Sequence, residues 1–135
     1  MKTKVYFYEH DKHYELIKSW FDAREFPAPA KKFLPPTGFI VEFEEKPVCA
    51  GFLFRTDANA AVMGNFISDP GALSTVRHLC LDTLIKHLQG EAYAGGFELL
   101  ACSTNIEKLG SRFEQMGFTK TDIGLNTYGR LLCQS

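Results

Sequence analysis

Short apolar runs separated by turn residues indicate strands in the first half of the chain. The segment 4–9 (KVYFYE) alternates and is rich in aromatic and β-branched residues, so it predicts a strand. Three further segments have the same character: 38–43, 48–55 and 60–67. Turn residues separate these three at 44–47 and 56–59, a spacing that favours an antiparallel meander.

Apolar residues that recur every three or four positions predict three amphipathic helices. The first has its apolar face at Tyr14, Ile17, Trp20 and Phe21, and it extends to about Phe26. The second follows position 74, with an apolar face at Val76, Leu79, Cys80, Leu84, Ile85 and Leu88. The third has its apolar face at Ile106, Leu109, Phe113 and Met116. Each of these helices can cover one face of a sheet.

A last strand and the third helix lie close together in sequence. Residues 97–102 (FELLAC) form a short apolar run, which predicts a strand buried on both faces. Thr104 and Glu107 have the spacing of a capping box at the start of a helix. Gly117 stands where a left-handed residue closes a helix. The segment therefore predicts a strand, a capped helix and a glycine exit.

The predicted elements combine into one α+β domain over residues 1–135. The tail 119–132 carries enough glycine and polar residues for one or two edge strands. The order is then β-α-β-β-β-α-β-α-β, a mixed, mostly antiparallel twisted sheet flanked by helices. A length of 135 residues corresponds to a single domain with a real core. An exposed edge at the C-terminal strands would permit a homodimer.

Composition and cysteine usage exclude several classes of protein. The formal net charge is -1, which does not favour non-specific binding to nucleic acid. The four cysteines, Cys49, Cys80, Cys102 and Cys133, lie far apart in apolar contexts, and none has zinc spacing with another cysteine or a histidine. The N-terminus leads into a strand, and the apolar runs are too short to span a membrane. We therefore expect a cytoplasmic protein with reduced, buried cysteines, no metal and no membrane contact.

The order of strand, Asn105, helix, Gly117 and Phe118, after a long amphipathic helix, resembles the C-terminal half of the GNAT superfamily of N-acetyltransferases. That family commonly reads N-x-x-A-x-x-L-Y-x-x-x-G-F here, and Phe113 stands close to the family's Tyr. With the predicted element order, the resemblance covers essentially the whole chain. The members that the chain resembles are divergent, small GNAT proteins of the bacterial or phage type. The resemblance implies an acyltransferase that uses acetyl-CoA as cosubstrate and transfers the acetyl group to an amine of a small molecule or protein by direct attack.

The resemblance implies that acetyl-CoA enters between the strand that ends at Ile67 and the strand that begins at Phe97. The pantetheine would run along the backbone of 65–68, and the pyrophosphate would rest on N–H groups at the following helix N-terminus. The implied cofactor-binding residues are Phe66, Ile67, Ser68, Gly71, Ala72, Ser74, Thr75, Arg77, Asn105 and Phe113. The alternative is an ordinary strand-to-helix loop capped by Ser74 or Asp69.

The chain departs from the family pattern at two places. The family's pyrophosphate loop reads Arg or Gln, x, x, Gly, x, then Gly or Ala; the nearest match here, 77–82 (RHLCLD), keeps the arginine and loses both small positions. The Tyr that usually protonates the leaving thiolate is replaced by Phe113. As substitutes we name Tyr128 and Ser111 as proton donors, and we name Glu42 as the general base. Glu44 and Asp57 are alternative bases, and each of these three carboxylates can instead be an ordinary surface residue.

Two other functions fit the sequence. Some GNAT-like proteins of bacteria and phages modify nucleobases in DNA, and Arg24, Lys31 and Lys32 form a small basic cluster for such a role. The Pro-rich segment 27–36 predicts an ordered loop over a cleft. The resemblance implies that this loop helps to form the acceptor site. A catalytically inactive GNAT fold used as a binding or assembly module would explain the missing Tyr and glycines.

Overall fold

The computed structural model describes residues 2–104, 106–122 and 124–132. The chain forms two compact units, Met1–Ser103 and Thr104–Ser135, and each is described by itself. The first unit contains a five-stranded sheet with the strands in sequence order: β1 (Thr3–Phe7), β2 (Gly38–Phe43), β3 (Lys46–Arg55), β4 (Ala60–Ser68) and β5 (Leu99–Cys102). Strands β1 to β4 pair antiparallel, and β5 pairs parallel with β4. The predicted α+β class and the meander are confirmed.

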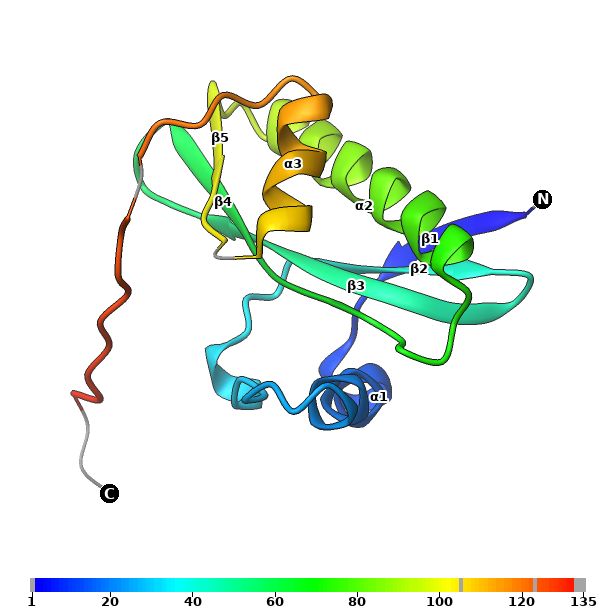
Figure 1. The fold of residues 1–135 in the computed structure, drawn as a ribbon. Helices are drawn as coiled ribbons and strands as arrows, with labels where there is room; N and C mark the ends of the chain where they lie inside the picture. The colour runs from blue at the N-terminus through cyan, green and yellow to red at the C-terminus, as the bar shows by residue number, and fades with distance from the viewer. Residues whose placement is uncertain (1, 105, 123, 133–135) are drawn as a thin grey trace. The chain divides into compact units, whose positions relative to one another are not determined.

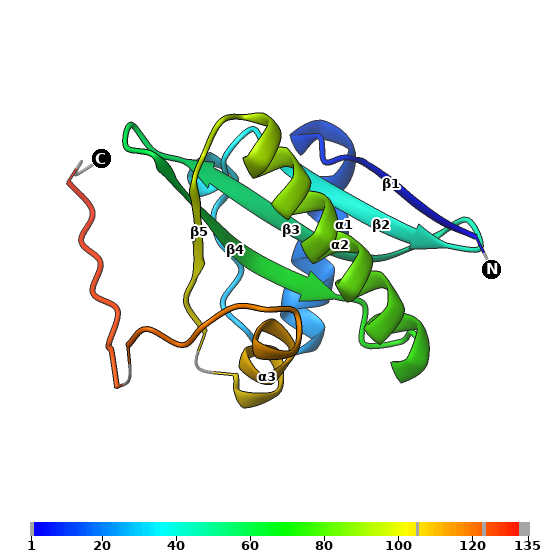
Figure 2. The same cartoon turned by 90° about the horizontal axis from the view of Figure 1, so that it is seen from above.

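Helices α1 (His10–Ala23) and α2 (Ser74–Ala94) lie on opposite faces of this sheet, as Figures 1 and 2 show. The apolar face of α1, with Ile17, Trp20 and Phe21, is buried in a cluster with sheet residues that include Ala50 and Phe52. Successive strand residues point to opposite faces, so Gly51 faces α2. The predicted apolar face of α2 is confirmed, because its middle is fully buried at Cys80, Leu84, Ile85 and Leu88.

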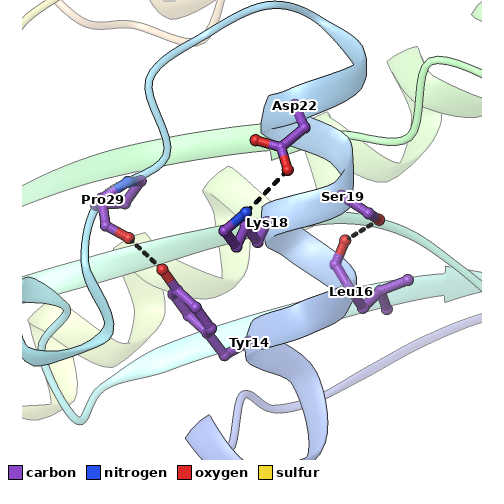
Figure 3. A network of polar contacts seen from close by, with 6 residues as sticks. All are labelled: Tyr14, Leu16, Lys18, Ser19, Asp22 and Pro29. Carbon is purple, nitrogen blue, oxygen red and sulfur yellow. Dashed lines mark hydrogen bonds and ion pairs between the residues drawn. The ribbon is translucent and has the colours of Figure 1, made fainter.

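The connection between α1 and β2 is held against α1. The Tyr14 hydroxyl donates a hydrogen bond to the carbonyl oxygen of Pro29 (2.8 Å), as Figure 3 shows. A short 3-10 helix, η1 (Lys31–Phe33), follows, and then Leu34 is buried in the same core cluster as α1. The prediction that 27–36 forms an ordered loop is confirmed, while its place over a cleft stays a prediction.

Strand β5 corrects one prediction. Its side chains are not buried on both faces, because Leu99 is 60% exposed. The strand lies at the end of the sheet, while α2 packs over β2 and β3 (Figure 2). The apolar sequence of a strand shows that its side chains are hydrophobic, but it does not show whether a helix covers that strand.

The second unit contains α3 (Glu107–Gln115), and it corrects two further predictions. The N-cap is Ile106, whose N–H donates to the Thr104 hydroxyl (3.0 Å), so the predicted capping box does not form. The described residues of the tail 119–132 form no strand, since they make no ladder with another strand. Gly117 closes the helix with a φ of 97°, as predicted.

Candidate functional site

A β-bulge distorts β4 near its C-terminal end. The register against β3 shifts there, so that Gly51 alone lies opposite Asn65 and Phe66. Asn65 has a φ of 55°, a left-handed conformation that few residues other than glycine adopt. A Cβ on Gly51 would lie 2.9 Å from the Phe66 ring and 3.0 Å from Cδ2 of Leu84. The bulge therefore packs into space that the missing side chain of Gly51 leaves beside α2.

The pairing of β4 with β5 ends just before the bulge. The two strands pair only over Ala60 to Met63 on the β4 side. No strand in the described parts of the chain runs alongside residues 64–68 on the side away from β3. Parallel strands end at the same edge of a sheet, so β5 also ends here, at Cys102. An extended ligand can pair with such an edge as an added strand.

The loop that follows β4 ends at an uncapped helix N-terminus. Within the loop, Oδ1 of Asp69 accepts a hydrogen bond from the N–H of Gly71 (2.8 Å). Helix α2 begins after Leu73, and no side chain caps it. Neither Ser74 nor Asp69 therefore caps the helix, so the capping proposed for an ordinary strand-to-helix loop does not form. The N–H groups of the first turn and the positive end of the helix dipole can receive an anion.

Arg77 holds this loop from the α2 side. Its Nη1 donates to the carbonyl oxygen of Pro70 (3.4 Å) and to that of Ala72. The N–H groups of Gly71 and Ala72 already donate to Asp69, so the groups that can receive an anion are the N–H groups of the first turn of α2, with the charge of Arg77 nearby. Asp69 is the nearby negative group, and its carboxylate already accepts the internal hydrogen bond from Gly71.

Arg24 holds the end of β4 from the α1 side. Its Nε–H donates to the carbonyl oxygen of Ser68 (2.9 Å), and its Nη2 donates to the Ser68 hydroxyl (2.8 Å). Burial, and then the charge of Arg77, lowers the pKa of Arg24, while Asp69 raises it. The sequence placed Arg24 in a basic cluster and missed this contact, because the two residues are 44 positions apart.

The structure brings most of the predicted cofactor-binding residues together. Those in positions 66–77 lie along the end of β4, the loop and the first turn of α2. Asn105 lies outside the described residues. Phe113 belongs to the second unit, where it is buried with its ring centroid 5.3 Å from that of Phe118. This ring contact accompanies the closing turn of α3.

The three predicted catalytic residues belong to two different units. Glu42 lies on β2. Strand β3 lies between β2 and β4, so β2 and β4 are about 10 Å apart. Glu42 accepts a hydrogen bond from Tyr6, whose pKa is raised by burial first and then by Glu42. Ser111 and Tyr128 both belong to the second unit; Ser111 is exposed on α3, and Tyr128 is 90% exposed. Their roles stay predictions.

The remaining polar features are more ordinary. The Nζ atoms of Lys31 and Lys32 lie 5.4 Å and 5.5 Å from the ring centroids of Tyr14 and Phe33. Among the described residues, no cluster of His, Cys, Asp and Glu is suited to hold a metal ion. No helix in the described ranges has the length and apolar character needed to cross a membrane.

Two of the predicted buried cysteines are confirmed. Cys49 and Cys80 are fully buried, and burial raises the pKa of the Cys80 thiol. Cys102 is half-buried rather than fully buried, and burial raises the pKa of its thiol to about 11. At neutral pH this thiol is protonated, which makes it a poor nucleophile. Cys133 lies outside the described residues.

No family model matches this chain, and no curated protein is similar to it in sequence. Solved structures are similar. An acetyltransferase from Trypanosoma brucei matches with a TM-score of 0.67 at 11% identity, over 94% of this chain and 99% of the other. A glucosamine-6-phosphate N-acetyltransferase from Arabidopsis thaliana matches with a TM-score of 0.63 at 15% identity, over 95% and 99%. An aminoglycoside acetyltransferase from an uncultured soil metagenomic sample, in complex with sisomicin, matches with a TM-score of 0.69 at 13% identity, over 96% of both chains. At such identities the likeness establishes a shared fold.

Proposed function

We propose that this chain, which has the fold of the GNAT acetyltransferases, is an acyl-CoA-dependent N-acyltransferase. One observation carries the proposal: a strand bulge, an open strand edge and an uncapped helix N-terminus follow one another within residues 64–75. The first two features suit an extended amide-bearing chain, and the third suits a phosphate group. Acetyl-CoA combines both chemistries, and we propose it as the cosubstrate.

The residues of the first unit fit such a ligand. The pantetheine amides would pair with the backbone of 64–68, and the pyrophosphate would rest on the N–H groups of Ser74 and Thr75. Gly71 is exposed and carries no side chain that would keep an anion from the backbone. Arg77 is close enough to the loop to add positive charge.

Acetyl-CoA supplies an activated thioester when it is bound, and the chain must orient it and move protons. The bond between the acceptor nitrogen and the acyl carbon forms, the C–S bond breaks, and CoA leaves as a thiol. The amine must lose a proton and the sulfur must gain one. For these steps we keep Glu42 as the proposed base and Ser111 or Tyr128 as the proposed donor. The acceptor would be an amine on a small molecule or a protein.

Calorimetric titration with acetyl-CoA tests the proposal, with Gly71→Glu as the informative variant. The new glutamate side chain would add a negative charge to the loop. Its Cβ would lie 3.3 Å from Oδ1 of Asp69, so the two carboxylates would be close to each other. Gly90→Glu is the control, because it adds the same charge farther along α2, where nothing lies within 4 Å of the new Cβ. We expect saturable binding by the wild type and by Gly90→Glu, and none by Gly71→Glu.

Two results would contradict this proposal. An absence of wild-type binding at millimolar acetyl-CoA would overturn the transferase function and leave an inactive binding or assembly module. Binding that Gly71→Glu retains in full would move the cofactor to another place. A DNA-modifying role has less support, because the guanidinium of Arg24 is already bonded to Ser68 and the net charge is -1. DNA binding that falls steeply with salt would favour it.

A further inference from the structure

We infer that Arg24 is a positioning residue for this site, which holds the last residue of β4 in the geometry that acyl-CoA binding requires. The inference rests on the proposed function. Arg24 contacts the strand and not the reacting atoms, and so it would act through Ser68. Both acceptor atoms of Ser68, the carbonyl oxygen and the hydroxyl, receive hydrogen bonds from the same guanidinium.

The fixed fork of an arginine makes this contact directional. Arginine presents several donors in one plane, and two parallel hydrogen bonds restrict both the distance and the orientation of the acceptor. The next residue is fixed from the other side, since the N–H of Asp69 donates to the carbonyl oxygen of Val48 on β3 (2.7 Å). The end of β4 is thus held by β3 and by α1 at the point where it leaves the sheet.

The end of α1 sets the position of Arg24. The N–H of Phe26 donates to the carbonyl of Phe21, and the N–H of Glu25 donates to that of Asp22, both at 3.0 Å. This is a Schellman motif with Arg24 as the C-cap. Glu25 occupies the position where glycine is usual, with a φ of 58°. A non-glycine residue persists in that conformation where its surroundings determine it, and such residues concentrate at functional sites.

The charges near Arg24 also bear on its role. Arg24 is part-buried near a second cation, Arg77; both effects disfavour its charged form, while the charge of Asp69 favours it. Neither arginine forms an ion pair within 4 Å among the described residues. A bound anion near the loop would offset the repulsion between the two arginines further.

The test compares acetyl-CoA affinity in Arg24→Ala, Arg24→Lys and Ser68→Ala. Arg24→Ala removes both hydrogen bonds, and we expect the dissociation constant to rise on the order of 10-fold or more. Arg24→Lys keeps the charge but loses the fork, so we expect a loss close to that of alanine. Ser68→Ala removes one acceptor and keeps the carbonyl, and its effect should be smaller. Lys18→Ala is the control, because Lys18 lies on the same helix and forms its ion pair with exposed Asp22.

A thermal unfolding curve for each variant separates loss of fold from loss of positioning. If Arg24→Ala does not fold, Arg24→Lys and Ser68→Ala still test the inference, since each keeps part of the contact. Full rescue by lysine would show that Arg24 acts only as a charge, and unchanged affinity in Arg24→Ala would show that it does not act on the site. Either result overturns the inference while the proposed function stands. A wild type that does not bind acetyl-CoA would remove both together.

Discussion

Replacing Gly51 with alanine should destabilise the protein, because the bulge in β4 occupies the space that a side chain would need. The new Cβ would lie 2.9 Å from the Phe66 ring and 3.0 Å from Cδ2 of Leu84. Leu84 is fully buried, so it has little room to retreat. Overpacking of this kind costs about 1–3 kcal/mol. The ring of Phe66 would have to move, and with it the bulge, so we also expect weaker acetyl-CoA binding.

Thermal unfolding followed by circular dichroism measures the effect, with Gly90→Ala as the matched control. In α2, nothing lies within 4 Å of a Cβ at Gly90, so the same substitution should stabilise by about 0.5–1 kcal/mol through helix propensity. A change of 1 kcal/mol shifts the midpoint by roughly 3–5 °C in a domain of this size. The two variants should therefore shift in opposite directions. A Gly51→Ala protein that unfolds at or above the wild-type temperature would refute the packing argument.

Two further substitutions test local features of the first unit. Glu45 lies in the two-residue turn between β2 and β3 with a φ of 68°, so Glu45→Gly should stabilise by about 0.5–1 kcal/mol in chemical unfolding, whereas Glu45→Ala should not. Nδ1 of His13 accepts a hydrogen bond from the N–H of Glu9 (2.9 Å), and burial lowers the pKa of His13 from its usual 6.5. The neutral imidazole of His13 stabilises the folded state. Its contribution to the free energy of unfolding is present in full above about pH 6.5, and it is lost as the pH falls through the lower pKa of the folded state. Urea unfolding across that range should show a smaller pH dependence in His13→Gln; an unchanged slope would contradict this assignment.

The strands and helices were largely predictable because their patterning is local. The strand at 38–43 has the predicted bounds, and α1 and α2 bury the apolar faces that their periodicity indicated. The exposure of Leu99 was not predictable, since it depends on which strands α2 covers. The left-handed turn at Glu44 and Glu45 had no sequence signal either, because the glycine or asparagine that usually marks such a turn is absent.

The candidate site was predictable only where it is continuous in sequence. Residues 66–77 follow one another along a strand, a loop and a helix start, and the family resemblance pointed to that stretch. Arg24 joins it through tertiary structure alone, from a helix on the other face of the sheet. Glu42 showed the reverse problem: its carboxylate fitted the chemistry, but β3 separates its strand from β4. The choice of base and acid therefore stays a prediction.

The most direct test of the central claim is the backbone amide NMR spectrum of the protein during a titration with acetyl-CoA. The account predicts that the largest chemical-shift changes occur at residues 64–75, along the open edge of β4, the loop and the first turn of α2. The side-chain Nε–H of Arg24 should shift with them, while amides of β1 should not. A spectrum that does not change at millimolar acetyl-CoA, or changes confined to residues outside this stretch, would contradict the account.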